Sequence, residues 1–235
     1  MQQLKLPNDG TKPSIFTRVL LFVTYFVAIE AVPVILLWVR KAGQAQFLLR
    51  SVLALCYLAG FIVIMVALIH SMKQVTTQSY WHWPTIKEMQ LILTTFVAAI
   101  AIEMILNVIN RSLFHQSQTA NNAAIKSLLA SDHWIFYLLM FSGVFLSPFV
   151  EELLFRGYLM NAFFKPESFW LPICVSAVFF SLAHASTTIV SYFIYMTLGF
   201  FLAYTYRRTN NLGASIALHM LNNLIAMVAM AAMMQ

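Results

Sequence analysis

Runs of about 20 apolar residues recur along almost the whole chain, and they constrain its fold more than any other feature. A helix that crosses the hydrocarbon core of a bilayer needs about 20 such residues. The sequence contains seven candidate spans, at residues 15–39, 46–71, 89–109, 133–164, 169–186, 188–206 and 212–233. Only 9% of the residues are charged, against about a quarter in soluble domains. The sequence therefore predicts an all-α, polytopic membrane helix bundle with about seven to eight transmembrane helices.

The stretches between the apolar runs are short, so we predict a single integral-membrane domain over residues 1–235. The longest polar stretch, residues 110–132, is predicted to be an exposed loop. The net charge of +6 comes from Lys and Arg residues scattered along the chain, as is typical of membrane-protein loops and not of a nucleic-acid-binding face. We expect a multi-pass protein of a bacterial plasma membrane, in contact with lipids and without a nucleic-acid partner.

The fourth apolar run contains the sequence PFVEELLFRGYL, in which Pro148 precedes three charged residues. Because proline removes a backbone donor, the helix is predicted to kink or restart there. Residues four apart share a helix face, so Glu152 is predicted to pair with Arg156. Glu151 lies about 100° further round the helix axis and is left free.

Two histidines, His184 and His219, lie within apolar runs that we predict to be helical. An ionisable group embedded in a membrane span is functional by default. Glu151 and His184 are each about 24 to 26 Å from the turn that joins the fourth and fifth runs, so they should lie at one depth. If the last helix packs against this hairpin, Glu151, His184, His219 and Asn223 line one cavity.

These four residues suggest hydrolysis of an amide without a covalent intermediate and without a cofactor. A buried carboxylate has a raised pKa and can act as a general base, so Glu151 with His184 would activate a water. His219 and the Asn223 amide would donate hydrogen bonds to the oxyanion. In an alternative that remains open, Glu151, His184 and His219 bind zinc, since their types match a hydrolytic zinc site. The HExxH motif, however, is absent.

Three segments in this order, EELLFRGYL, FFSLAHAS and IALHMLNNL, resemble the EExxxR, FxxxH and HxxxN motifs of the CPBP family of intramembrane proteases. That family includes the type II CAAX prenyl endopeptidases and bacterial proteins linked to bacteriocin processing and self-immunity. The resemblance covers about residues 145–225. It implies that Glu151 and His184 activate water, that Glu152 and Arg156 form a structural pair, that Phe180 packs beside the site, and that His219 and Asn223 hold the oxyanion.

We therefore predict an intramembrane endopeptidase that cleaves a membrane-associated peptide or a lipidated protein, with a role in peptide processing or bacteriocin self-immunity. Residues 133–233 would form the catalytic helices and residues 1–130 a scaffold. Alternatives are a zinc-dependent form of this hydrolase, a non-catalytic immunity or scaffold protein, and a small transporter. Other embedded polar residues are expected to form charge pairs between helices, namely Glu30, Arg50, Glu103 and Asn107.

Overall fold

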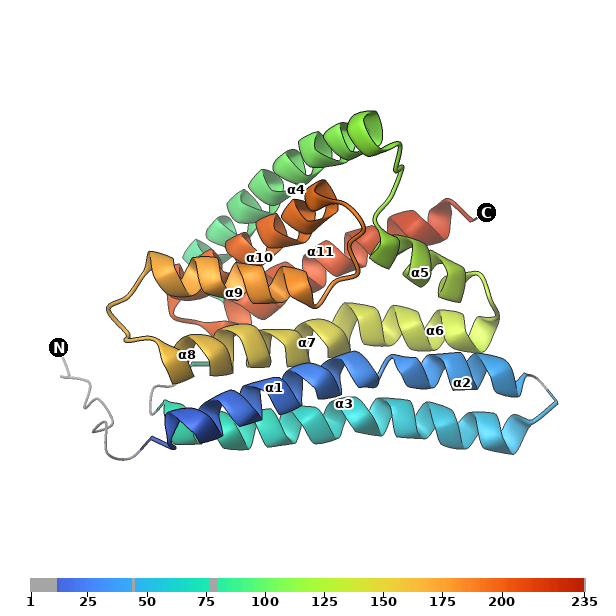
Figure 1. The fold of residues 1–235 in the computed structure, drawn as a ribbon, viewed down its shortest axis with the longest axis horizontal. Helices are drawn as coiled ribbons and strands as arrows, with labels where there is room; N and C mark the ends of the chain where they lie inside the picture. The colour runs from blue at the N-terminus through green and yellow to red at the C-terminus, as the bar shows by residue number, and fades with distance from the viewer. Residues whose placement is uncertain (1–11, 44, 77–79, 235) are drawn as a thin grey trace.

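A computed structural model describes residues 12–43, 45–76 and 80–234, and within these ranges every regular element is a helix (Figure 1). Two of the elements, η1 and η2, are π-helical turns. The elements are α1 Ile15–Ala31, α2 Val34–Ala42, α3 Phe47–Val75, α4 Ile86–Phe114, α5 Ala120–Leu129, α6 His133–Phe141, η1 Ser142–Leu146, α7 Ser147–Glu152, η2 Leu153–Leu159, α8 Met160–Phe163, α9 Trp170–Leu182, α10 Ile189–Thr209 and α11 Leu212–Ala232.

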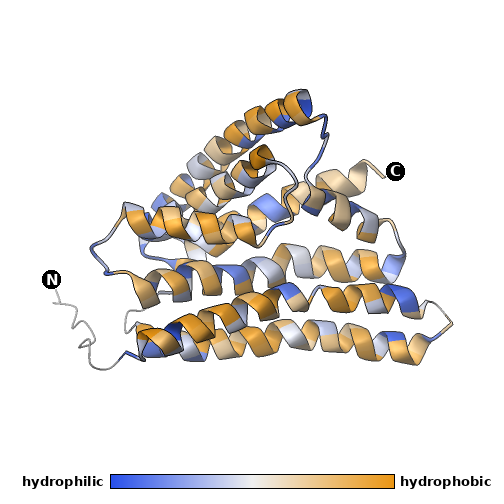
Figure 2. Ribbon diagram, viewed as in Figure 1, coloured by the Kyte–Doolittle hydropathy of each residue, from blue (hydrophilic) through white to orange (hydrophobic). Residues whose placement is uncertain are grey.

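Six of the helical segments are long and apolar enough to cross a membrane, and α9 is a shorter apolar helix. Apolar residues predominate along the helices, as the orange ribbon in Figure 2 shows, and many of the Leu, Ile, Val and Phe side chains are exposed on the outside of the bundle. The predicted all-α membrane bundle is thereby confirmed, and the chain is a multi-pass membrane protein. The six segments are Ile15–Ala42, Phe47–Val75, Ile86–Phe114, His133–Phe163, Ile189–Thr209 and Leu212–Ala232.

The continuous helix from α6 to α8 runs through the middle of the bundle (Figure 1). α1, α2 and α3 lie along one side of it, and α4, α9, α10 and α11 lie on the other side. Two glycines allow close packing in this arrangement. A Cβ on Gly157 would lie 2.5 Å from Met72 Cε of α3, and a Cβ on Gly199 would lie 3.0 Å from the Ala177 Cα of α9.

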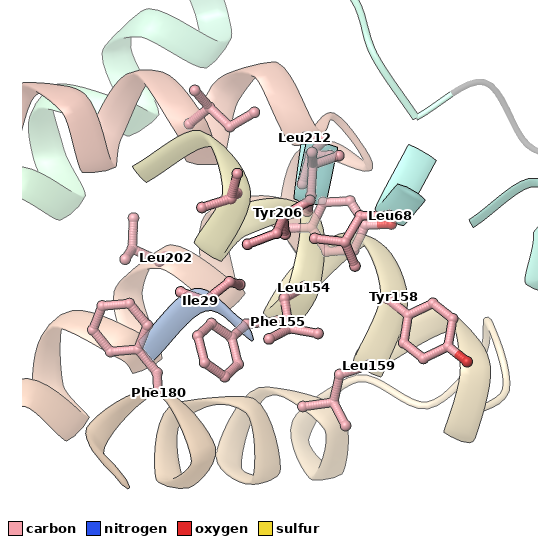
Figure 3. Packing of buried hydrophobic residues seen from close by; sticks show 14 of the residues in the cluster. Ile29, Leu68, Leu154, Phe155, Tyr158, Leu159, Phe180, Leu202, Tyr206 and Leu212 are labelled. Atoms are coloured by element: carbon pink, nitrogen blue, oxygen red, sulfur yellow. The ribbon is translucent and has the colours of Figure 1, made fainter. Parts of the chain in front are cut away.

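Helices from both sides of the bundle, among them α1, α3, α9, α10 and α11, contact η2, whose seven residues are all buried. Figure 3 shows Phe155, Phe180 and Leu202 converging at the centre of this core. The Phe155 and Phe180 rings pack edge to face with their centroids 5.6 Å apart. This apolar packing surrounds the polar residues of the fourth span and excludes water from them, which strengthens their mutual electrostatic attraction.

Pro148 changes the helix register without ending the helical span. Residues 133–163 run as one helical span of 31 residues, and the turn Ser142–Leu146, which ends two residues before the proline, is π-helical. A new α-helical segment, α7, begins after this turn with Pro148 in its first turn, so the α-helix restarts at the proline as predicted while the span continues. A π-helical turn can accommodate a proline, which has no backbone N–H for the usual helical hydrogen bond. Such turns are frequent at functional sites.

Two local predictions were wrong. Within the polar stretch 110–132, which we expected to be an exposed loop, residues Ala120–Leu129 form helix α5. The Thr119 side chain caps α5 by accepting a hydrogen bond from the backbone N–H of Asn122 at 3.2 Å. Leu129 of α5 is buried. The second error concerns His184, which lies beyond the end of α9 instead of within a helix.

An ion pair between Arg50 of α3 and Asp132, the N-cap of α6, fixes the start of the fourth span. Burial alone would raise the pKa of Asp132, but hydrogen bonds from Arg50 and from the amides of Ile135 and Trp134 hold the pKa below its ordinary value of 3.8. A depressed carboxylate pKa contributes stability that is complete above the ordinary value and is lost as the pH falls through the folded-state value.

We therefore expect the melting temperature in mild detergent to fall as the pH is lowered below about 4 in the wild type, and to fall less in Asp132→Asn. Asparagine caps a helix about as well as aspartate, so this variant removes the charge and keeps the cap. Melting curves recorded across this pH range measure the difference. If the melting temperatures of the two proteins fell equally with pH, the lowered pKa would not belong to Asp132.

Candidate active site

Glu152 is the centre of a buried polar network that joins the fourth and last spans. Its side chain is 0% exposed. It accepts from Arg156 Nη1 at 2.8 Å, from His219 Nδ1 at 2.9 Å and from Ser215 Oγ at 2.6 Å. Arg156 in turn donates to the Gly199 carbonyl at 2.7 Å. The predicted pair of Glu152 and Arg156 is present, and in addition Glu152 orients His219, a link that the sequence did not indicate.

Because Glu152 accepts from His219, the proton of that ring is fixed on Nδ1 and Nε2 faces the other glutamate. His219 Nε2 lies 3.9 Å from Glu151 Oε2, which is longer than a hydrogen bond. Glu151 is only 8% exposed. Its Oε1 accepts from Ser147 Oγ, whereas Oε2 is buried without a hydrogen-bond partner. The Glu151 carboxylate therefore has one anchored oxygen and one oxygen free for chemistry.

His184 is held in the turn that follows α9. Its Nδ1 bonds to the Phe180 carbonyl at 2.8 Å, so Nδ1 carries the proton and Nε2 is the free nitrogen of the neutral ring. The imidazole also packs against the Phe180 and Tyr195 rings, with centroids 4.6 Å and 4.4 Å away. The predicted contact of Phe180 with His184 is present, although the two residues do not share one helix.

Asn223 of α11 donates from Nδ2 to the Gly143 carbonyl at 2.8 Å. In the π-helical register of η1, that carbonyl would pair with the amide of residue 148, but Pro148 has no N–H. The proline therefore leaves an acceptor inside the bundle that Asn223 uses. One N–H of the amide is anchored in this way, and the second N–H remains for another acceptor.

A cavity of about 420 Å³ lies beside these residues, lined by Glu151, His184 and Asn223. His219 is not on the wall of the cavity but directly behind it, buried against Glu152. Of the four residues predicted to line one cavity, Glu151, His184 and Asn223 do so. His219 contacts this group through Glu151.

Polar residues outside the predicted site also line the cavity, among them Glu30, Glu103, Asn107 and Asn222. We expected Glu30 and Glu103 to form charge pairs, but neither has an ion pair among residues 12–43, 45–76 and 80–234. The expectation holds for Arg50, which pairs with Asp132. The spacing of Glu103 and Asn107, four residues apart on α4, is the signal that places both on one helix face.

The donor atoms of the site determine whether it could hold zinc. Each histidine donates from Nδ1 to an oxygen and has Nε2 free, which suits a metal ligand with second-shell support. In the described part of the chain, however, no three side chains of His, Cys, Asp or Glu lie close enough together to hold one metal ion. The arrangement as it stands does not fit a three-ligand zinc site.

Comparison with known proteins identifies the segment that contains all these residues. Residues 133–225 match the family model of the Rce1-like type II CAAX prenyl endopeptidases, which confirms the resemblance drawn from the three motifs. A protein of Bacillus subtilis (strain 168), named "Putative membrane peptidase YdiL", is 25% identical over 91 residues. The alignment covers 39% of this chain and 36% of that protein. No solved structure matches significantly.

Proposed function

We propose that this chain is an intramembrane endopeptidase that hydrolyses a peptide bond of a membrane-associated peptide or a lipidated protein. One observation carries the proposal. The free Oε2 of Glu151 is buried at the wall of a cavity, 3.9 Å from His219 Nε2, and the same wall contains His184 and Asn223. A buried carboxylate with one oxygen left without a hydrogen bond is costly in a membrane interior, so a function is the expected reason for its presence.

In the proposed reaction, Glu151 Oε2 removes a proton from a water molecule while the free Nε2 of His184 orients that water. The water oxygen adds to the carbonyl carbon of the peptide bond, and the carbonyl oxygen becomes an oxyanion. The second N–H of Asn223 and the Nε2–H of protonated His219 stabilise this charge. Glu151 then transfers its proton to the amide nitrogen, and the C–N bond breaks to give a carboxylic acid and an amine.

The carboxylates on both sides of His219 support its role. Donation from Nε2 requires the imidazolium form, because Glu152 already accepts the Nδ1 proton. Glu152 at 2.9 Å and Glu151 at 3.9 Å are both placed to stabilise that positive charge. In the zinc-dependent alternative, Glu151 and the two Nε2 atoms would hold the metal, and the side chains would have to move closer together.

Cleavage assays on the full chain in liposomes test the proposal. The probes are a signal-like peptide, a farnesylated peptide and an unmodified membrane-associated peptide, with products followed by mass spectrometry. We expect wild type to cleave at least one probe, and His184→Ala and His219→Ala to lower kcat about 10²-fold or more. Tyr137→Phe, which alters an exposed side chain of α6, is the control.

Two further outcomes separate the alternatives. Loss of activity in a chelator, restored by added zinc, would favour the metal-dependent form. If no probe were cleaved and both histidine variants still protected host cells from a bacteriocin as well as wild type does, the catalytic proposal would fail in favour of a non-catalytic immunity or scaffold protein.

A further inference from the structure

Helix α5 and the segment that leads into it from α4 are bonded to the loop that carries His184. The backbone N–H of Asn121 donates to the Ala185 carbonyl at 3.1 Å. The side chains of Gln116 and Thr187 form two hydrogen bonds with each other, at 2.9 and 3.1 Å. The same helix lines the cavity through Asn122 and other residues of its inner face. Figure 1 shows α5 between the end of α4 and the start of α6. α5 is therefore placed to contact both a substrate and the His184 loop.

Tyr195 of α10 makes the most direct of these connections. Its ring lies against the His184 imidazole, with centroids 4.4 Å apart and planes inclined by 22°. Its hydroxyl lies 2.5 Å from Thr119 Oγ1, at the N-terminus of α5, and 3.3 Å from Asn122 Oδ1. Thr119 and Tyr195 are both buried. One end of Tyr195 thus contacts the proposed water-orienting residue, and the other end is anchored on α5.

A second constraint on His184 makes the role of Tyr195 specific. The Phe180 carbonyl fixes the Nδ1 position of the ring, and the Phe180 ring lies against the imidazole with centroids 4.6 Å apart. Packing against the Tyr195 ring at 4.4 Å limits rotation of the imidazole further, and the hydroxyl bond to Thr119 keeps the Tyr195 ring in place. Productive geometry at a catalytic group needs such support from its neighbours.

We infer that Tyr195 is a positioning residue, which holds the His184 ring in its working orientation and couples that orientation to helix α5 through Thr119. The inference rests on the proposed function only in treating His184 as part of the reaction. A substrate that displaces α5 would alter His184 through this connection, whereas a substrate that leaves α5 in place would not.

Kinetics of single and double variants test the coupling. Tyr195→Phe keeps the stacked ring and removes the anchor, so we expect kcat to fall about fivefold, the worth of one hydrogen bond, with KM unchanged. Thr119→Val should lower kcat at least as much, because it also removes the cap of α5, and Thr119→Ser should keep wild-type activity. If both changes break the bond between Tyr195 and Thr119, the double variant loses no more than Thr119→Val alone. Additive losses, or a change in KM alone, would overturn the coupling.

A spectroscopic measurement keeps the test independent of catalysis. In protein labelled with ¹⁵N-histidine, the His184 signals are assigned from their absence in His184→Asn. We expect Tyr195→Phe and Thr119→Val to shift the His184 ring signals in the same direction and to leave the His219 signals unchanged. Unshifted His184 signals refute the inference even if peptides are cleaved. A wild type that cleaves nothing, with shifted His184 signals, refutes the proposed function and retains the inference.

Discussion

Replacing Glu151 with glutamine is expected to lower kcat for peptide hydrolysis by about 10²- to 10⁴-fold, the range attributed to a positioned general base. The amide has nearly the same size as the carboxylate and can still accept the Ser147 hydroxyl that now bonds to Oε1. It cannot remove a proton from water. KM should stay close to the wild-type value, because the cavity keeps its shape and its other polar residues.

The same substitution should leave stability unchanged or raise it. Oε2 of Glu151 is buried without a hydrogen-bond partner, and removing an ionised carboxylate from water costs more free energy than removing a neutral amide. Loss of activity with an unchanged or higher melting temperature separates a catalytic role from misfolding. Glu103→Gln removes another carboxylate from the cavity wall, so it is the matched control and should cost far less activity. An equal loss in both variants would show that the cavity needs negative charge in general, not a base at residue 151.

The parts of the molecule that could be predicted from the sequence are those set by local rules. Apolar length alone located six of the seven predicted spans, because a bilayer requires about 20 residues per helix whatever their contacts. The remaining one, predicted at residues 169–186, contains α9, which has only 13 residues. Spacing of four residues predicted the pair of Glu152 and Arg156, which the structure shows at 2.8 Å. The ordered motifs also located the segment 133–225 that matches the Rce1-like family.

The parts that could not be predicted depend on contacts between distant segments. The bond from His219 to Glu152 joins residues 67 positions apart, and helical phase cannot reveal it. α5 is short and polar in sequence, and such a helix needs tertiary packing to be stable, here against α6 and α11. His184 lies outside α9 because the chain turns at Ala183. Glu30 of α1 and Glu103 of α4 line the cavity only because of how the whole helices are arranged.

Breaking the buried pair at the centre of the site should have the largest effect on stability. Glu152 and Arg156 are both 0% exposed, so Glu152→Gln leaves the Arg156 charge without a counter-charge, and Arg156→Met does the same to Glu152. We expect each single variant to lose about 3 to 5 kcal/mol of unfolding free energy. Equilibrium unfolding in mixed detergent micelles measures this loss. Arg208→Met, which changes an exposed arginine, should stay within about 0.5 kcal/mol of wild type.

Combining Glu152→Gln with Arg156→Met separates the structural role of the pair from its role in orienting His219. Removing both charges together leaves no uncompensated ion, so the double variant should be more stable than either single variant. Activity should not recover with stability, because His219 Nδ1 then donates to a neutral amide that does not stabilise an imidazolium. Recovery of both stability and kcat in the double variant would mean that Glu152 acts only as the partner of Arg156. Recovery of stability alone would assign to Glu152 the second role that its 2.9 Å bond to His219 indicates.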